Sequence, residues 1–267
     1  MSEQYVLETR NLVKEFKGFV AVDDVNLKVQ KGHIHALIGP NGAGKTTVFN
    51  LLTKFLIPTR GQILFKDQDI TTMKSAAIAR QGIVRSFQIS AVFPHMTALE
   101  NIRVALQTFE GTSFSFWKSG NSLHKLNQRC MELLDAVGLA EFANTTTVEL
   151  AYGRKRALEL ATTLAMEPEI LLLDEPTQGM GSEDVDRVVE LVRKAAAGRT
   201  VLMVEHNLSV VSKLCDRITV LAQGAVLTEG DYAAVSADPR VREVYMGSDG
   251  SGERGTTADS EQSEAAQ

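Results

Sequence analysis

The chain has 267 residues, of which 44% are hydrophobic and 23% are charged, and its formal net charge is −5. This balance offers no basic surface to a polyanion, so nucleic acid is a poor candidate partner. The apolar runs are too short to cross a bilayer and residues 1–5 lack the features of a signal peptide, so we expect a cytoplasmic protein.

The negative charge is concentrated near the C-terminus. Residues 248–267 contain five acids and one base, and they include no large apolar side chain. A segment of this composition cannot bury enough apolar surface to offset the entropy lost on folding. We therefore expect 248–267 to be a disordered acidic tail that follows a folded domain of residues 1–247.

Hydrophobic periodicity predicts strands at the start of the chain, over residues 5–16 and 22–29. The mainly apolar run 34–38 indicates a third strand, which should be buried. A glycine-rich segment follows this strand directly.

Residues 39–47 read Gly-Pro-Asn-Gly-Ala-Gly-Lys-Thr-Thr, which fits the phosphate-binding loop G-x-x-x-x-G-K-[ST]. Glycines let successive backbone N–H groups point at a phosphate chain, and the helix start behind the loop favours an anion. Lys45 would reach the β- and γ-phosphates, and the Thr46 hydroxyl would bind Mg²⁺. The predicted nucleotide-binding residues are Asn41, Gly42, Ala43, Gly44, Lys45, Thr46 and Thr47. This P-loop predicts a nucleoside triphosphate site.

Behind the P-loop, apolar residues recur at helical spacing and predict an amphipathic helix. They are Val48, Leu51, Leu52 and Phe55. Strands are then expected over 62–65 and 83–87, with a short helix over 71–80 between them.

The pattern changes after the strand 83–87, because two helices follow each other, over 97–107 and 122–137. Between them, 108–121 places aromatic residues among Gly and Ser. This segment is either a surface loop with a small apolar cluster or a patch that faces a partner. We expect residues 89–156 to form a helical subdomain that interrupts an α/β core.

The α/β order then resumes and continues to the end of the domain. Helices are expected over 155–166, 182–197 and 208–215, strands over 170–173 and 200–204, and a hairpin over 217–229. Strands that alternate with helices predict a largely parallel, doubly wound sheet, and the first strands and the last hairpin should form an antiparallel flank. The expected fold class is α/β: a P-loop NTPase core (1–88 and 157–247) with a parallel sheet, an antiparallel β flank and a helical subdomain insert.

The strand 170–173 ends in two carboxylates, Asp174 and Glu175. In an open α/β sheet the ligand lies beyond the carboxyl ends of the strands, where these acids emerge. Asp174 suits the Mg²⁺ shell of a P-loop protein. Glu175 could orient an attacking water molecule and accept its proton.

The segment Leu-Ala-Tyr-Gly-Arg at 150–154 precedes the helix that leads to this strand. Here the chain resembles the ATP-binding subunits of ABC transporters, whose signature motif is L-S-G-G-Q. The order of the other motifs agrees with that family over about residues 5–246. The matching positions are Gln88 for the Q-loop, Asp174-Glu175-Pro176-Thr177 for D-E-P-T, His206 for the switch histidine and Phe16 for the aromatic residue that stacks on adenine.

The resemblance implies an ATPase that uses ATP and Mg²⁺. In the family, two ATP molecules are sandwiched between two such domains, which places Ala151 and Gly153 at the nucleotide of a second, identical or different, subunit. The implied catalytic residues are Glu175, His206 and Gln88, and the implied Mg²⁺ ligands are Thr46, Gln88 and Asp174. The other implied partners are membrane permease subunits and, indirectly, a solute-binding protein, at the cytoplasmic face of the membrane.

The chain departs from the family pattern at two motifs. Ala151 stands where the signature has serine, which removes a hydroxyl donor, and Arg154 adds a charge that could offset the loss. Residues 178–181 read Gln-Gly-Met-Gly where the family often has S-A-L-D, so an aspartate is missing. Both departures concern contacts between subunits.

Local details look like the ATPases of branched-chain amino acid importers, whose relatives take up urea, short amides or other small polar solutes. They are Leu-Ala-Tyr-Gly at 150–153, Gly-Met at 179–180, Val-Glu-His-Asn-Leu at 204–208 and Ser-Phe-Gln at 86–88. Three alternatives remain at this point: an exporter or lipid-extraction ATPase, a non-transport ATPase that acts on DNA or ribosomes, and a P-loop kinase or GTPase.

Overall fold

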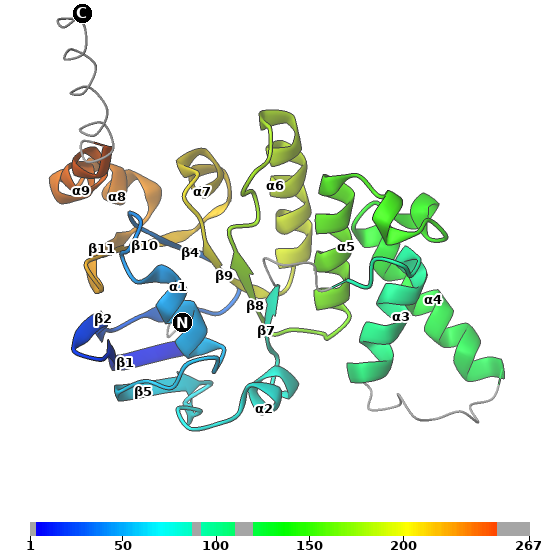
Figure 1. Cartoon of the computed structure of the whole chain (residues 1–267), viewed down its shortest axis with the longest axis horizontal. Helices are drawn as coiled ribbons and strands as arrows, with labels where there is room; N and C mark the ends of the chain where they lie inside the picture. The colour runs from blue at the N-terminus through cyan, green and yellow to red at the C-terminus, as the bar shows by residue number, and fades with distance from the viewer. Residues whose placement is uncertain (1–3, 87–91, 110–119, 250–267) are drawn as a thin grey trace, which may run out of the picture.

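The computed structural model describes residues 4–86, 92–109 and 120–249, which form two β-sheets with helices around them (Figure 1). The first sheet has the order β2-β1-β5-β6, with β3 also paired to β1, and its strands pair antiparallel. Its strands are β1 (Tyr5–Phe16), β2 (Phe19–Val25), β3 (Lys28–Gln30), β5 (Arg60–Phe65) and β6 (Gln68–Asp69). The antiparallel flank predicted for the start of the chain is confirmed.

The second sheet has the order β11-β10-β4-β9-β8-β7 and is parallel from β10 to β7. Its strands are β4 (Ile34–Ile38), β7 (Ile83–Ser86), β8 (Ile170–Asp174), β9 (Thr200–Val204), β10 (Arg217–Ala222) and β11 (Ala225–Gly230). The prediction that the last hairpin would join the antiparallel flank is wrong, because β10 pairs in parallel with β4 and extends this sheet. A hairpin pattern predicts local pairing and does not indicate which strand the hairpin joins.

The predicted strand over 22–29 is two strands that pair with different parts of β1. Asp24 has a left-handed backbone (φ 49°), and the amide of Asn26 donates to the carbonyl oxygen of Asp24 at 2.9 Å. The turn divides the segment between two stretches of β1, although Val25, Leu27 and Val29 all face the same core. Leu12 therefore pairs with Val25 on β2, while Leu7 pairs with Val29 on β3.

The parallel sheet separates two hydrophobic cores because alternate side chains point to opposite faces. On β4, Ala36 and Ile38 belong to the core that includes the helices α5, α6 and α7. Leu37 belongs to the other core, which contains α1 (Lys45–Leu52) and the buried side of the antiparallel sheet. Helix α1 thus lies between the two sheets, and its Phe49 is fully buried there.

The helix α1 ends earlier than its apolar spacing predicts. Thr53 closes the helix and Lys54 adopts a left-handed backbone (φ 61°), so the chain turns away from the core. Phe55, expected on the buried face, therefore lies outside the helix with 55% of its surface exposed.

The remaining α-helices lie around the two sheets, and most of them cover the free face of the parallel sheet or the two ends of the molecule. They are α2 (Ser75–Arg80), α3 (Ala98–Phe109), α4 (Gly120–Ala136), α5 (Tyr152–Leu164), α6 (Ser182–Ala196), α7 (Leu208–Leu214), α8 (Tyr232–Ala237) and α9 (Pro239–Asp249). Figure 1 shows α3, α4 and α5 grouped at one end and α8 and α9 at the other. Within the described residues, no helix has the length and apolar character needed to span a membrane.

Two predictions reach the limits of the described residues. The helix α9 continues through Asp249 and so includes the first two residues of the expected acidic tail, and the rest of the tail lies outside the described residues. Most of the aromatic segment 108–121 also lies outside them. The cysteines Cys130 and Cys215 are both free thiols.

A buried polar chain crosses the strands β4, β10 and β11. The Thr219 hydroxyl donates to Glu229 Oε2 at 2.8 Å, so it accepts a hydrogen bond from His35 Nε2, also at 2.8 Å. Burial lowers the pKa of His35 to about 4, opposed by the charge of Glu229 and aided by Arg217 and His33. His35 is therefore neutral in the folded protein at neutral pH.

The low pKa of His35 should make the protein less stable in acid. The unfolded state binds a proton near the ordinary histidine pKa of 6.5, so the contribution of neutral His35 is complete above that pH and is lost as the pH falls towards about 4. The loss should approach about 3 kcal/mol of unfolding free energy. Urea titrations at pH 7, 5.5 and 4.5 should show a flatter pH dependence for His35→Gln than for the control His33→Gln. Equal slopes in the two variants would contradict this expectation.

Candidate functional site

Three neighbouring strands end at one edge of the parallel sheet. In the ladder, Leu37 on β4 lies opposite Val204 on β9, and Val204 lies opposite Asp174 on β8. Ligands of open α/β sheets bind outside this edge, near the carboxyl ends of the strands. The fold therefore brings together the P-loop after β4, the carboxylates at the end of β8 and His206 after β9.

The P-loop has a conformation that only glycine fits at two positions. Gly44 lies just before α1 with φ 98°, and a Cβ there would approach the carbonyl oxygen of Ala21 to 2.6 Å. Gly39 has φ 149°, and a Cβ there would lie 2.2 Å from the carbonyl oxygen of Leu221. Close contact with β2 and β10 therefore holds the loop in one shape.

The P-loop carries donors suited to a phosphate chain. No described residue accepts a hydrogen bond from the backbone N–H of Asn41, Gly42 or Gly44. Lys45 is buried, and its ammonium donates to the carbonyl oxygens of Gly39 at 2.8 Å and Pro40 at 2.9 Å. Unpaired N–H groups around a cation at a helix start form an anion site, so the loop fits the predicted triphosphate.

Burial lowers the pKa of the Lys45 ammonium, while the nearby carboxylates of Glu175 and Asp174 raise it. The two acids at the end of β8 therefore lie within electrostatic range of the P-loop lysine. This proximity is what the predicted roles of all three residues require.

Asp174 has a partner that the sequence did not predict. Its carboxylate forms an ion pair with the guanidinium of Arg85 on β7, and both side chains are largely buried. The same guanidinium donates to the side-chain oxygen of Asn50 on α1 at 2.7 Å. Arg85 thus ties the carboxylate predicted to face Mg²⁺ to the helix that follows the P-loop.

The residues present fit a Mg²⁺ ion that is held mainly through a nucleotide. Within the described ranges, no group of three or more His, Cys, Asp and Glu side chains could hold a metal ion. Magnesium in nucleotide sites keeps several water molecules and takes only one or two carboxylates together with phosphate oxygens. One exposed hydroxyl, Thr46, and one carboxylate, Asp174, match that requirement.

Glu175 has an unusual backbone. It adopts a left-handed conformation (φ 47°), which is uncommon for a residue other than glycine and is typical of functional turns. Its N–H donates to the carbonyl oxygen of Val204 at 2.9 Å, which fixes the turn to the end of β9. Its side chain is half-buried at the edge of the sheet.

The other predicted catalytic and adenine-binding residues are placed less completely. His206 is exposed just beyond β9, where the resemblance predicts it. Gln88, predicted to contact Mg²⁺ and water, lies outside the described residues. Phe16 pairs with Phe19 at the tip of the β1–β2 hairpin, and the two residues are 40% and 68% exposed. Either ring is accessible for stacking on a base.

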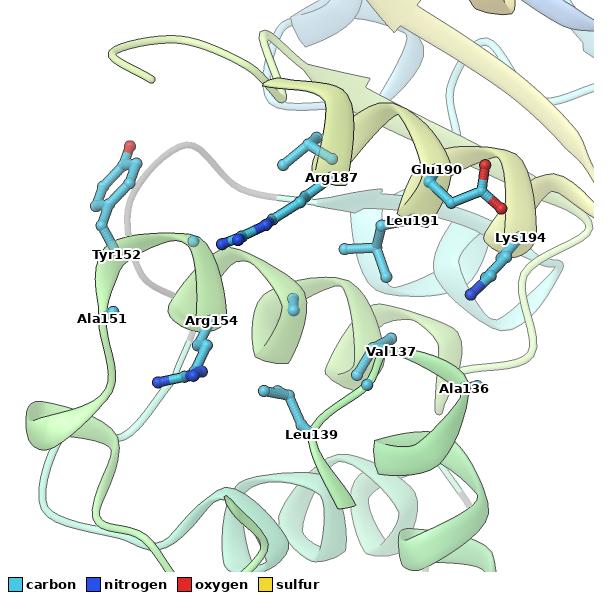
Figure 2. A pocket seen from close by; sticks show the side chains of 14 residues that line it. Ala136, Val137, Leu139, Ala151, Tyr152, Arg154, Arg187, Glu190, Leu191 and Lys194 are labelled. Atoms are coloured by element: carbon cyan, nitrogen blue, oxygen red, sulfur yellow. The ribbon is translucent and has the colours of Figure 1, made fainter. Parts of the chain in front are cut away.

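The signature segment begins the helix α5. Ala151 occupies the N-cap position with an extended backbone, and no side chain caps the helix there. Gly153 lies in the first turn, and the segment lines a cavity of about 440 Å³ between α5, α6 and the end of α4. Figure 2 shows Arg187 of α6 and Arg154 of α5 on opposite sides of this cavity, with apolar side chains such as Leu139 and Leu191 between the helices.

The two bulky signature residues make contacts inside their own chain. The Tyr152 hydroxyl donates to the carbonyl oxygen of Gln178 at 3.4 Å, which links the signature segment to the turn after β8. The guanidinium of Arg154 lies 4.0 Å from the centre of the Phe142 ring. The charge that replaces the last signature residue is thus held against an aromatic ring of the same subunit.

Comparison with known protein families and relatives gives one consistent result. The family model described as "ABC transporter" matches residues 22–178, and the one described as "Branched-chain amino acid ATP-binding cassette transporter" matches 225–251. The chain is 39% identical to the high-affinity branched-chain amino acid transport ATP-binding protein BraF of Pseudomonas aeruginosa, over 91% of this chain and 98% of BraF. It is 34% identical to the lipopolysaccharide export system ATP-binding protein LptB of Acidithiobacillus ferridurans, over 92% and 98% of the two chains.

Solved structures agree with these relatives. The ADP conformation of an ATP-binding cassette of an ABC transporter superposes with a TM-score of 0.79 at 29% identity, covering 91% of this chain and 99% of that chain. A dimeric ATP-binding cassette in a post-hydrolysis state, bound to ADP and Pi, gives a TM-score of 0.71 at 26% identity, over 85% and 98%.

Proposed function

Because this chain belongs to the ABC transporter family and is an ATP-hydrolysing cassette of it, we propose that it powers the import of a small polar solute. Branched-chain or other amino acids are the first candidates. The observation that carries this proposal is the match of residues 225–251, beyond the nucleotide-binding motifs, to the branched-chain amino acid model. Lipid export is the second candidate, because the LptB relative is 34% identical over nearly its whole length.

The proposed site uses residues from four segments. The P-loop N–H groups and Lys45 bind the phosphates of ATP, and Phe16 stacks on its base. Thr46, Asp174 and Gln88 would hold Mg²⁺, which would neutralise negative charge on the phosphates when bound. Arg85 keeps Asp174 oriented from behind, in the manner of an outer-shell partner.

Hydrolysis is proposed to depend on Glu175 and His206. Glu175 orients a water molecule in line with the γ-phosphate and accepts its proton, and the His206 side chain donates to a phosphate oxygen. The hydrogen bond from Glu175 N–H to Val204 fixes the turn that carries Glu175 to the end of β9, which favours preorganisation of this carboxylate.

The second half of the site is proposed to come from another subunit, identical or different. Ala151 and Gly153, at the exposed N-terminus of α5, would face the nucleotide held by the partner's P-loop. A related cassette is dimeric in its ADP and Pi state. The dimer would dock on permease subunits at the cytoplasmic face of the membrane, and its closure would complete the catalytic site.

Replacement of Ala151 by Ser should leave ATP turnover in the assembled transporter equal or raised. Serine restores a hydroxyl donor toward the partner's phosphate, and at an N-cap it should also stabilise α5 by about 0.5–1 kcal/mol. Phosphate release and thermal unfolding measure the two effects. The control Ala136→Ser adds a hydroxyl to an exposed position lining the same cavity and should change neither. A large loss of turnover in Ala151→Ser would contradict the donor argument.

Transport in vesicles tests the proposed function directly. The chain is purified with its membrane partners, reconstituted into proteoliposomes and supplied with the copurifying solute-binding protein. ATP-dependent uptake of labelled leucine, isoleucine or valine that requires the binding protein supports import of branched-chain amino acids. ATP-dependent release of lipid without a binding protein would establish export instead.

A further inference from the structure

Glu205 is a fully buried carboxylate at the end of β9, and its relative exposure is 0%. Its Oε1 accepts hydrogen bonds from the N–H of Thr177 at 3.1 Å and from the Thr177 hydroxyl. Its Oε2 accepts from the N–H of His206 and the N–H of Asn207, both at 3.0 Å. One side chain therefore joins the turn after β8 to the turn after β9.

The Glu205 carboxylate has no ionic partner, since no Lys, Arg or His of the described part of the chain lies within 4.0 Å of its oxygens. A buried charge of this kind is stable only when hydrogen bonds satisfy it. Three of its four donors are backbone N–H groups, which cannot reverse their role and accept. Both side-chain oxygens of Glu205 must therefore accept hydrogen bonds. A glutamine at this position would offer only one acceptor oxygen, because its other terminal atom is an NH₂ donor.

The two joined turns carry the proposed catalytic groups. Thr177 lies two residues after Glu175, whose left-handed backbone persists only where its surroundings determine it. The hydrogen bond from Glu175 N–H to the carbonyl oxygen of Val204 holds one side of this turn. The hydrogen bonds from Thr177 to the Glu205 carboxylate hold the other side. After β9, the same carboxylate accepts hydrogen bonds from the N–H groups of His206 and Asn207, which fixes this turn. Asn207 in turn caps α7.

We propose that Glu205 is a positioning residue that locks the Glu175–Thr177 turn to the His206 turn, so that the groups on either side of the terminal phosphate keep one relative geometry. This inference rests on the proposed roles of Glu175 and His206. Glu205 does not touch the nucleotide and acts through the two turns. Its removal should therefore lower turnover and spare the binding of nucleotide to the P-loop.

The test compares Glu205→Gln and Thr177→Val, alone and combined, with the conservative variant Thr177→Ser. For Glu205→Gln, kcat for ATP hydrolysis should fall about 10- to 100-fold, the range expected when a hydrogen-bonded charged group is lost. The Kd for a fluorescent ADP analogue should stay within about twofold. Thr177→Val should lose part of the same turnover, Thr177→Ser should keep it, and the double variant should fall no further than Glu205→Gln.

The control Glu229→Gln removes a carboxylate that also accepts from a threonine hydroxyl, on β11, and its kcat should stay unchanged. The positioning role is overturned if kcat in Glu205→Gln matches this control, or if nucleotide binding falls in parallel with kcat. If Glu205→Gln does not fold, the two Thr177 variants provide the test. A kcat that is lowered in Thr177→Val but not in Thr177→Ser supports the proposal, and an equal kcat in the two variants overturns it.

Two further variants separate this proposal from the proposed function. Loss of turnover in Glu175→Gln together with wild-type turnover in Glu205→Gln overturns the positioning role alone. Wild-type turnover in both Glu175→Gln and His206→Ala overturns the catalytic roles from which the positioning role is inferred.

Discussion

Replacement of Glu175 by Gln should lower ATP turnover by about 10²- to 10⁴-fold, the contribution typical of a positioned general base. Glutamine keeps the size of the side chain and its hydrogen-bonding reach, but it cannot accept a proton from water. The left-handed turn and its bond to Val204 involve only the backbone, so the variant should fold normally. The loss would therefore report chemistry and not structure.

Binding of MgATP should survive in Glu175→Gln, because the P-loop and Lys45 are unchanged. We expect an ATP-bound dimer that does not turn over, measured by phosphate release and by gel filtration with Mg-ATP. Glu190→Gln, an exposed change on α6, is the matched control and should hydrolyse ATP normally. Retained hydrolysis in Glu175→Gln would remove the base role from this residue.

The nucleotide site was predictable because its signals are local in the sequence. The P-loop combines strand, glycine turn and helix start within residues 34–52, and Asp174 and Glu175 end an apolar run. In the structure β4, β9 and β8 run parallel, as the doubly wound pattern predicts, so their carboxyl ends meet at one edge of the sheet. The roles of the P-loop residues, Asp174 and Glu175 stay predictions from the sequence, and those of Phe16 and Gln88 stay predictions from the resemblance.

The features that the sequence did not reveal depend on contacts between distant residues. Arg85 and Asp174 are 89 positions apart, and nothing near either one indicates their pairing. The hairpin of β10 and β11 joins β4, which precedes it by more than 170 residues. Glu205 could have been noticed, because it ends the apolar run 201–204 as Asp174 ends the run 170–173. Its value as an acceptor becomes clear only when Thr177 is placed beside it.

In the proposed mechanism, the carboxylates at the ends of β8 and β9 have separate tasks. Asp174 reaches the P-loop side through Arg85 and Asn50, while Glu205 holds the turns that carry Glu175 and His206. Under the proposed roles, the first arrangement would support the binding of nucleotide and the second would support its hydrolysis. Variants on the two sides should therefore separate affinity from turnover.

Replacement of Lys45 by Ala is the complementary variant, and it should abolish tight nucleotide binding. Removing the buried ammonium takes away the cation that would face the phosphates and leaves the carbonyl oxygens of Gly39 and Pro40 without their donor. Loss of one partner of a buried charge pair typically costs about 2–5 kcal/mol, so the affinity for ATP and ADP should fall by about 30-fold to a few thousandfold. Calorimetric titration with each nucleotide measures the change.

The control for Lys45→Ala is a second lysine close to α1 that has no predicted role in binding. Burial lowers the pKa of Lys54 to about 8, and its ammonium donates to the carbonyl oxygen of Thr71 at 3.2 Å. Lys54→Ala should therefore lower the thermal stability and leave the ADP affinity unchanged. If Lys45→Ala binds ADP as tightly as Lys54→Ala does, the backbone N–H groups of the P-loop suffice for the phosphates. The lysine would then act on the loop's shape and not on the ligand.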